Sequence, residues 1–533
     1  MKEKIKPYLA AIVLAGRRRR KTASTYLATE FHADENGIQL SGWLFYTRKL
    51  PGKEFRLDKF RDGRVRELFY AELPPRNLVE KVANKLCAIL LNFRFRRFSL
   101  SMPINWAELP SSQYSFYATG NRLRYPSPIR EQVFHPSSDR TVLIGCDRIF
   151  QQSLRAEVLS FGGAVFDKLS SEAQSATDDT ARTKCLIGEY TISARDNGYA
   201  LFNSITSGVL GNTEIDAQYV IERNNPDGIP IGRGIVEFGT EEHMRACLST
   251  NVVAHAWDKR NVLPLIVDHI ARHRFARIKS LFLQHGVLAL KSGIEGNYHK
   301  DKDATDAFIV SSSREKLVVQ ERFGYAPEDI FITGLARHDE LYEKARLSPV
   351  EPEGVLIFPT WRPYLVGSEL AHVAASDWGQ TMISLLHGLK RESIPSTLIL
   401  HQIAAHTAPL FEGLVDEIRT VNEFQDTLIA RKILITDYSS VALEATLIGR
   451  QTAFFTSKEI SRQVRKAYIS YPNELPGPAF VDAQHLALAI KSDEIDSPRN
   501  ADLFFELRDG NACHRIVQVI RALHANAKPA ARR

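Results

Sequence analysis

Residues 433–449, ILITDYSSVALEATLIG, combine residue types that suit phosphate binding. Residues 433–436 are typical of a short buried parallel strand, the next four residues of a polar turn, and the segment from Val441 to Gly449 of a helix. A strand that leads directly into a helix brings backbone N–H groups, small hydroxyls and the positive end of the helix dipole to one point, where a phosphate is favoured. The pattern also fits an ordinary turn in which Asp437 or Ser439 only caps the helix.

His285 has the chemistry and the predicted position of a general base. It follows the apolar run 281–283 and precedes Gly286, so we expect it on a sharp turn at the end of a strand. Imidazole exchanges protons near neutral pH, although a histidine at a strand end is also a common structural residue. Lys291 and Gly293 follow at a spacing that could add a cation and a flexible loop.

Other predicted strand ends carry groups that could bind phosphate oxygens. Thr360 and Arg362 offer a hydroxyl and a guanidinium fork, although an arginine after a buried tryptophan can also be a plain surface residue. Arg337 could make a phosphate contact or an interdomain ion pair, and His401 could neutralise developing charge. The remaining candidates are Ser439, Ser440 and Glu444, the last for a sugar or ribose hydroxyl.

Together these groups favour a nucleotide-diphosphate donor held by fixed dipoles and hydrogen-bond donors, a chemistry that requires neither a metal nor a cofactor. The sequence contains no GxGxxG or GxxxxGK[ST] motif, which argues against a dinucleotide oxidoreductase and a P-loop kinase, and no HExxH motif.

The elements that would position these side chains form two series of apolar runs, each alternating with helical stretches. The runs are 141–146, 218–222, 251–257, 280–286 and 306–312, followed by 354–359, 396–402, 432–437 and 451–456. Such alternation predicts an α/β protein with two Rossmann-like domains, each built on a doubly wound parallel sheet, with a cleft between them.

We expect six segments along the chain. Period-two alternation with glycine-containing turns predicts a small β-rich, sandwich-like accessory module over 26–135. The predicted segments are a basic leader at 1–25, this module, an N-terminal acceptor-side domain at 136–342, a linker at 343–354, a C-terminal donor-binding domain at 355–510, and a C-terminal helix and tail at 511–533.

The composition favours a folded protein with a basic N-terminal segment. The 533 residues include 69 lysines and arginines against 62 acidic residues, and positions 17–21 form an unbroken basic run. This run could bind an anionic membrane surface or a polyanionic substrate, or it could be a solvated terminus. No nucleic-acid-binding motif supports a nucleic acid partner.

Two further features bear on location. The apolar stretch 8–15 is much shorter than the roughly 20 residues that span a bilayer, so we expect neither a transmembrane helix nor a cleaved signal. The five cysteines are scattered, as in a cytosolic protein with reduced thiols. These features predict a peripheral protein at the cytoplasmic face of the cell membrane.

Several motifs resemble those of the CDP-glycerol glycerophosphotransferases, the teichoic acid polymerase family, over about residues 185–490. The motifs occur in the family's order: TGLARHDEL (333–341), FPTWR (358–362), LILHQ (398–402), ILITDYSSVALEA (433–445) and YPNELPGPAF (471–480). FLQHGVLALKSG (282–293) is similar to the family's WHG-type segment, and ARDNGYALF (194–202) to its first-domain helix. These two segments place Lys291 and Asn197 on the acceptor side.

The resemblance implies a GT-B-like fold and metal-independent transfer of glycerol phosphate, or a related polyol phosphate, from CDP-glycerol or a similar CDP-polyol. The acceptor would be a hydroxyl of a cell-surface polymer, such as teichoic acid or capsule, or of its lipid-linked primer, and CMP would be released. By position, His285 matches the proposed catalytic base, with His401 as a second catalytic candidate. The donor-binding residues would be Arg337, Thr360, Arg362, Ser439, Ser440 and Glu444.

The sequence departs from the family's pattern at three places. Gln284 stands where tryptophan is usual, 288–291 replaces a Pro-Leu-Lys segment, and Glu444 replaces an aspartate. These departures bear on the identity of the acceptor more than on the fold. Two alternatives remain: a GT-B glycosyltransferase that uses a nucleotide sugar, and a non-catalytic polymer-binding protein with the same fold, which only the departure at Gln284 supports.

Overall fold

A computed structural model describes most of the chain. The described residues are 24–46, 55–59, 65–67, 69–73, 94–103, 112–118, 121–122, 130–137, 140–149, 153–175, 182–264, 277–290, 294–301, 305–362, 365, 368–457, 460 and 467–526. The basic run 17–21, nearly all of the predicted leader, Lys291 and Gly293 lie outside these ranges. Predictions about them are therefore not addressed by the structure.

The N-terminal part of the chain forms antiparallel strands. One sheet has the order β1-β2-β6-β5, and a second has the order β4-β3-β7-β11-β10-β9, with β8 paired to β7. The strands are β1 Ser24–Asp34, β2 Gly37–Tyr46, β3 Phe55–Lys59, β4 Val65–Glu67, β5 Phe69–Leu73, β6 Arg94–Pro103, β7 Ser112–Ala118, β8 Asn121–Arg122, β9 Arg130–Ser137, β10 Arg140–Ile149 and β11 Ser153–Gly162. The predicted β-rich region is confirmed, whereas its sandwich-like packing stays a prediction.

The antiparallel region extends further than the sequence predicted. The run 141–146 was assigned to the parallel sheet, but it lies in β10, which pairs antiparallel with β9 and β11. The boundary predicted at residue 136 is therefore too early. An apolar run of this length fits a buried strand of either kind, and here its neighbour in the chain is a second strand rather than a crossover helix. Helix α3, Gly163–Ser175, then leads towards the parallel sheet.

The first parallel sheet has seven strands in the order β14-β13-β12-β15-β16-β17-β18. They are β12 Thr183–Gly188, β13 Ile215–Ile221, β14 Ile235–Glu237, β15 Val252–His255, β16 Lys279–Phe282, β17 Ala307–Val310 and β18 Ile330–Ile332. The accompanying helices are α4 Asn197–Thr206, α5 Glu241–Ser249, α7 Glu295–Tyr298, α8 Ser313–Val318 and α9 Ala336–Leu347. From β12 the chain adds strands towards one edge of the sheet, and from β15 onwards it adds them towards the other edge. The place between β12 and β15 is therefore the switch point where ligands bind in such sheets.

The second parallel sheet repeats this design with six strands in the order β21-β20-β19-β22-β23-β24. They are β19 Val355–Ile357, β20 Ser396–Ile399, β21 Glu417–Arg419, β22 Ile433–Thr436, β23 Gln451–Phe455 and β24 Ala479–Phe480. Its helices are α10 Leu370–Ala375, α11 Asp377–Arg391, α12 Phe424–Ala430, α13 Val441–Leu447 and α15 Ala483–Lys491. The switch point lies between β19 and β22. The two parallel sheets confirm the predicted α/β fold with two Rossmann-like units.

Local sequence explains where several helices begin. Ser and Thr side chains accept the N-cap hydrogen bond of α5, α8 and α11, and an aspartate does so for α15. Short 3-10 or π segments connect other elements: η2 Lys259–Asn261, η3 Val319–Phe323, η4 Pro327–Asp329, η6 Gln402–Leu410 and η7 Val421–Glu423. The predicted linker at 343–354 is partly helical, since α9 continues to Leu347.

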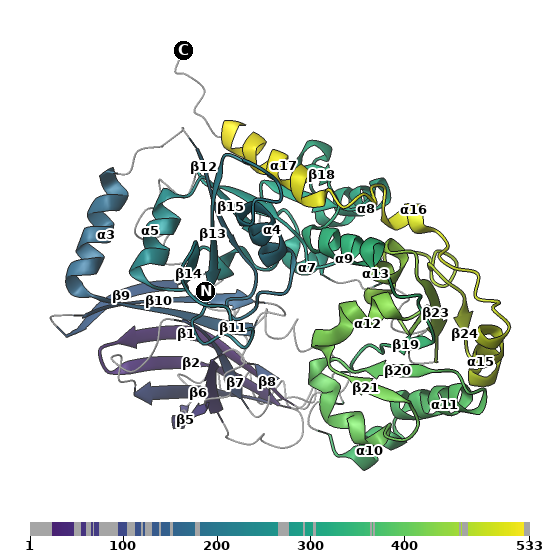
Figure 1. Ribbon diagram of the computed structural model, residues 1–533. Helices are drawn as coiled ribbons and strands as arrows, with labels where there is room; N and C mark the ends of the chain where they lie inside the picture. Colours follow the sequence, from purple (N-terminus) through teal and green to yellow (C-terminus); the bar gives the residue numbers. More distant parts are fainter. Residues whose placement is uncertain are drawn as a thin grey trace.

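The C-terminal helix returns to the first parallel sheet. After α16, Ala501–Phe504, helix α17, Ala512–Asn526, crosses over the first sheet, as Figure 1 shows in yellow. The Asp339 carboxylate accepts hydrogen bonds from the backbone N–H groups of Ala512 (2.9 Å) and Cys513 (2.7 Å) and so caps α17. These hydrogen bonds fix α17 to α9, so the last helix of the chain packs on the first half of the molecule.

Of the helices that the structure describes, none is both long and apolar enough to span a membrane.

Candidate active site

Glu189 organises the first switch point. It follows β12 and is 2% exposed. Its carboxylate accepts hydrogen bonds from the backbone N–H groups of Arg195 (2.7 Å), Asp196 (3.0 Å) and Tyr199 (3.1 Å), which fixes the loop that leads into α4. The pKa of Glu189 is raised to about 8. Burial is the main cause, and the negative charge of the neighbouring Asp196 carboxylate adds to it. Glu189 is not among the residues predicted from the sequence, although a carboxylate directly after a buried strand is a usable signal.

Trp257 brings an indole onto the candidate base. It follows β15, and its ring stacks on His285 with centroids 4.1 Å apart and an interplanar angle of 13°. Tyr190 stacks on Trp257 at 4.3 Å, and the indole N–H donates to Asp196 (3.1 Å). His285 itself lies on the predicted turn after β16 and is half-buried. Although Gln284 replaces the usual tryptophan, the neighbouring strand thus supplies an aromatic partner that the sequence analysis did not predict.

Asn197 links three elements at this end of the sheet. Its side-chain amide donates to the Gln284 carbonyl oxygen (3.0 Å) and accepts from the Arg337 backbone N–H (3.1 Å). Asn197 is fully buried. These contacts support a positioning role for Asn197, which holds α4, the His285 turn and the start of α9 together.

Arg337 forms one of the two contacts proposed for it, the interdomain ion pair. Its Nη2 lies 2.6 Å from Glu444 Oε1 on α13, and its Nη1 lies 3.6 Å from Asp196 Oδ1. Burial lowers the pKa of Arg337, but the carboxylates of Glu444, Asp196 and Glu189 raise it more, so the guanidinium stays charged. Burial raises the pKa of Glu444, and Arg337 opposes this effect. A permanent cation therefore lies between the two halves.

Thr360, Arg362 and Asp437 form a closed network at the second switch point. Asp437 Oδ1 accepts from the Thr360 hydroxyl (2.6 Å) and backbone N–H (3.0 Å), and Asp437 Oδ2 lies 2.9 Å from Arg362 Nη2. Arg362 is 2% exposed, and its Nη1 donates to the Thr360 carbonyl oxygen (2.6 Å). The interpretation of Arg362 as a surface residue is therefore wrong. In this structure both residues direct donors at Asp437, so their phosphate contacts stay a prediction.

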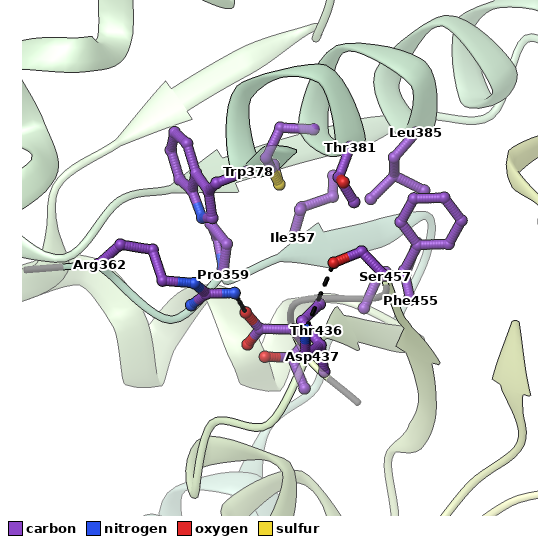
Figure 2. Close-up of a pocket in the computed structure, with 13 residues that line it drawn as sticks. Ile357, Pro359, Arg362, Trp378, Thr381, Leu385, Thr436, Asp437, Phe455 and Ser457 are labelled. Atoms are coloured by element: carbon purple, nitrogen blue, oxygen red, sulfur yellow. Dashed lines mark hydrogen bonds and ion pairs between the residues drawn. The ribbon is translucent and has the colours of Figure 1, made fainter. Parts of the chain in front are cut away.

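A cavity lies beside this network. Figure 2 shows it between α11 and the carboxyl ends of the central strands, with Arg362 and Asp437 pointing towards each other at one wall. Most of its lining is apolar, with Trp378 and Leu385 from α11 and Phe455 from β23. The cavity and the polar network thus share the second switch point, where a nucleotide ligand is expected in such a sheet.

The two halves meet at Gly286. A Cβ atom at this position would lie 3.9 Å from Arg337 Nη2 and 3.9 Å from Ser440 Oγ. Ser440 precedes α13, and Ser439 beside it is buried. The structure therefore brings the His285 turn, Arg337, Ser440 and Glu444 to one place. The ring of His401 lies 5.9 Å from that of Trp361, which precedes Arg362.

Within the described ranges, His, Cys, Asp and Glu side chains form no group of three that could hold a metal ion.

Two doubly wound parallel sheets with polar side chains at both switch points define a GT-B-like protein. The chain belongs to the CDP-glycerol:poly(glycerophosphate) glycerophosphotransferase family, whose model matches residues 189–522. The family resemblance predicted from the motifs is therefore confirmed.

Curated relatives act in teichoic acid synthesis. A teichoic acid glycerol-phosphate transferase of Staphylococcus aureus is 23% identical over 249 residues, which cover 42% of this chain and 63% of the relative. A teichoic acid poly(ribitol-phosphate) polymerase of Bacillus spizizenii is 27% identical over 236 residues, covering 40% of this chain and 36% of the relative. The chain thus spans less than two thirds of the length of these two relatives.

A solved structure supports the fold. The wall teichoic acid polymerase TagF superposes with a TM-score of 0.50 at 16% identity, and the match covers 68% of this chain and 94% of that one. At this identity the similarity shows the fold alone.

Proposed function

We propose that the protein transfers glycerol phosphate, or a related polyol phosphate, from a CDP-linked donor to a hydroxyl of a cell-surface polymer or its primer and releases CMP. Membership of the glycerophosphotransferase family supports the donor and the reaction type. One observation carries the proposal: the turn that bears His285 lies close to Arg337 of the same half of the molecule and to Ser440 of the other half. His285 is the neighbour of Gly286 on this turn, so the proposal places the base beside the groups that bind the transferred phosphate, as phosphoryl transfer requires.

His285 starts the proposed reaction. Its imidazole takes the proton of the acceptor hydroxyl, and the oxygen forms a bond to the β-phosphorus of the donor, the one that carries the glycerol. The bond between that phosphorus and the bridging oxygen breaks, and CMP leaves with the electron pair. Stacking on Trp257 fixes the plane of the imidazole ring, so the base is oriented before the acceptor arrives.

Arg337 and Ser440 stabilise the charge of the transferred phosphate in this proposal. The guanidinium is already held between the halves by Glu444 and Asp196, and a bound phosphate would compete with these carboxylates for it. A fixed cation costs little reorganisation during the reaction. His401 stays a proposed second catalytic residue that neutralises charge on the donor side.

The second switch point supplies the proposed donor pocket. We assign Thr360 and Arg362 the task of fixing Asp437 and the turn before Ser439, because their hydrogen-bond donors are used there. The adjacent cavity at the ends of β19 and β22 offers apolar walls to a flat base. The rest of the turn then faces the pyrophosphate.

The location and the acceptor side of the proposal rest on the sequence. We propose peripheral binding to an anionic membrane at its cytoplasmic face through the basic leader, a lipid-linked or polymeric acceptor, and a contact from Lys291. Removing residues 1–21 should shift the protein from sedimenting with anionic liposomes to the supernatant. Unchanged sedimentation would contradict the proposed role of the leader.

A donor panel tests the proposed reaction. The purified protein is incubated with an acceptor primer and either CDP-glycerol, CDP-ribitol or a UDP-sugar, and released nucleotides are separated by ion-exchange chromatography. We expect acceptor-dependent CMP from a CDP-polyol and no UDP. Release of UDP alone would favour a glycosyltransferase, and no release with any donor would favour a polymer-binding protein.

A further inference from the structure

We propose that Gln284 and Glu315 are positioning residues that together clamp the turn carrying His285. The inference rests on the proposed function, because it assigns His285 the role of the base. Gln284 appeared in the sequence motifs only as a departure from the family's pattern, Glu315 belongs to none of them, and both residues are 2% exposed. Their contacts reach the turn on both sides of His285.

Gln284 holds a backbone conformation that glutamine rarely adopts. Its φ angle is +56°, in the left-handed region, directly before His285. Such a conformation costs on the order of 1 kcal/mol or more and persists only where surrounding contacts enforce it. Here the Gln284 side-chain amide donates to the Ile309 carbonyl oxygen (2.5 Å) and to Glu315 Oε1 (3.2 Å), while its backbone carbonyl accepts from Asn197 (3.0 Å). Three different elements therefore fix this one residue.

Glu315 closes the clamp from the other side. Its Oε1 also accepts from the Leu288 backbone N–H (2.7 Å), and its Oε2 accepts from the Ser311 backbone N–H (2.6 Å). The same carboxylate oxygen thus binds residues on either side of His285. A carboxylate suits this place because every polar neighbour named here donates a hydrogen bond to it.

Two opposing effects act on the pKa of Glu315. Burial raises the pKa of its carboxyl to about 7, and the hydrogen bonds from Leu288, Ser311 and Gln284 limit that rise. The protonated acid would point an O–H group at N–H donors and would lose part of the clamp. Helix α8 holds the group in place, because the Ser312 hydroxyl accepts from the Glu315 backbone N–H (3.2 Å) and donates to the Leu503 carbonyl oxygen (2.7 Å).

The clamp matters for catalysis because the backbone at residue 284 sets where the next side chain points. If the side-chain contacts are lost, the backbone can leave the left-handed region, and the His285 ring then moves relative to Trp257 and Arg337. A misplacement of about 1 Å can cost about 10²-fold in rate. Donor binding at the other half should change little.

The test compares Glu315→Gln with Glu321→Gln, which makes the same chemical change at an exposed residue of the following segment η3. We expect Glu315→Gln to lower kcat for CMP release by about 10- to 100-fold, with the Kd for CDP-glycerol unchanged and Glu321→Gln like wild type. In a His285→Ala background, Glu315→Gln should cause no further loss of kcat. An unchanged kcat, or an equal loss in both backgrounds, would overturn the proposal.

A second readout does not require activity. Diethylpyrocarbonate modification of His285 is followed by mass spectrometry, with His401 in the same digest as the internal reference. The ratio of the His285 to the His401 rate should rise several-fold in Glu315→Gln, and an unchanged ratio would overturn the clamp even if wild type released no CMP. If Glu315→Gln does not fold, Gln284→Gly, which tolerates the same φ angle but lacks the amide, should give the same rise.

Discussion

The ion pair between Arg337 and Glu444 permits a test that separates a structural role from donor binding. The two side chains are 22% and 10% exposed and lie 2.6 Å apart. Removing one partner of a buried pair costs about 3 to 5 kcal/mol because the other charge remains buried. The partial exposure of Arg337 places Arg337→Met near the lower value, about 3 kcal/mol, which lowers Tm by about 6 to 12 °C at 2 to 4 °C per kcal/mol.

The double variant Arg337→Met, Glu444→Leu removes both charges and should recover most of the lost Tm, since an apolar pair of similar volume often replaces a buried pair without cost. CMP release should nevertheless stay at least 10²-fold below wild type, because the phosphate has lost its cation. Differential scanning fluorimetry and the CMP assay give both numbers. Wild-type CMP release by the double variant would show that Arg337 has only a structural role and does not bind the donor phosphate.

A matched control lies on the same helix. Lys344 and Glu340 form an exposed pair, 2.7 Å apart, with side chains 47% and 61% exposed. The variant Lys344→Met should change the free energy of unfolding by no more than about 0.5 kcal/mol and should leave CMP release at the wild-type value.

Three further predictions follow from the site. Gly286→Ala should stay active, because its Cβ would lie 3.9 Å from both Arg337 Nη2 and Ser440 Oγ and is accommodated there. Gly286→Leu should fill the space in front of Arg337 and Ser440 and abolish CMP release without loss of Tm, as measured by the same two assays. Asp437→Asn should leave Arg362 buried without its charged partner and cost about 3 to 5 kcal/mol, seen as a large fall in Tm; a fall no larger than that of Lys344→Met would contradict the network. The pKa of Glu189 is about 8 in the folded protein against a usual 4.5, so the protonated carboxyl stabilises the fold, fully below pH 4.5. This contribution is lost as the pH rises to 8, by at most about 1.4 kcal/mol per pH unit. Glu189→Gln should flatten the dependence of Tm on pH over this range, and an unchanged dependence would argue against the titration of Glu189.

The sequence predicted those features of the fold that depend on residues close together in the chain. The strand, turn and helix around Asp437 follow from a short apolar run, small polar residues and a terminal glycine, and β22 has the predicted bounds Ile433–Thr436. Gly449, with a φ of +72°, lies just beyond α13, where the sequence placed the helix end. The position of His285 at the end of β16 was equally legible.

The partners of these residues could not be predicted, because they come from distant parts of the chain. Thr360 bonds to Asp437, 77 positions away, and Arg337 to Glu444, 107 positions away. Sequence spacing shows that such groups lie at strand ends, but only packing decides whether an arginine faces a carboxylate or a ligand. Glu315 was missed for the same reason, since a glutamate in the first turn of a short helix normally faces solvent.

The run 141–146 shows a different limit. Apolar strands of the antiparallel and parallel regions have similar composition, and both its neighbours, β9 and β11, had to be identified before its sheet was known. The hairpin partner 153–162 has the alternation of an antiparallel strand and was the available signal.

The proposed mechanism depends on His285 as the base that activates the acceptor. The most direct measurement is the single-turnover rate of acceptor-dependent CMP release at saturating CDP-glycerol for wild type and His285→Ala, with the donor Kd from isothermal titration calorimetry. We expect His285→Ala to lower this rate by about 10²- to 10⁴-fold and to leave the Kd for the donor within a few-fold of wild type. A His285→Ala enzyme that releases CMP within tenfold of the wild-type rate would contradict it.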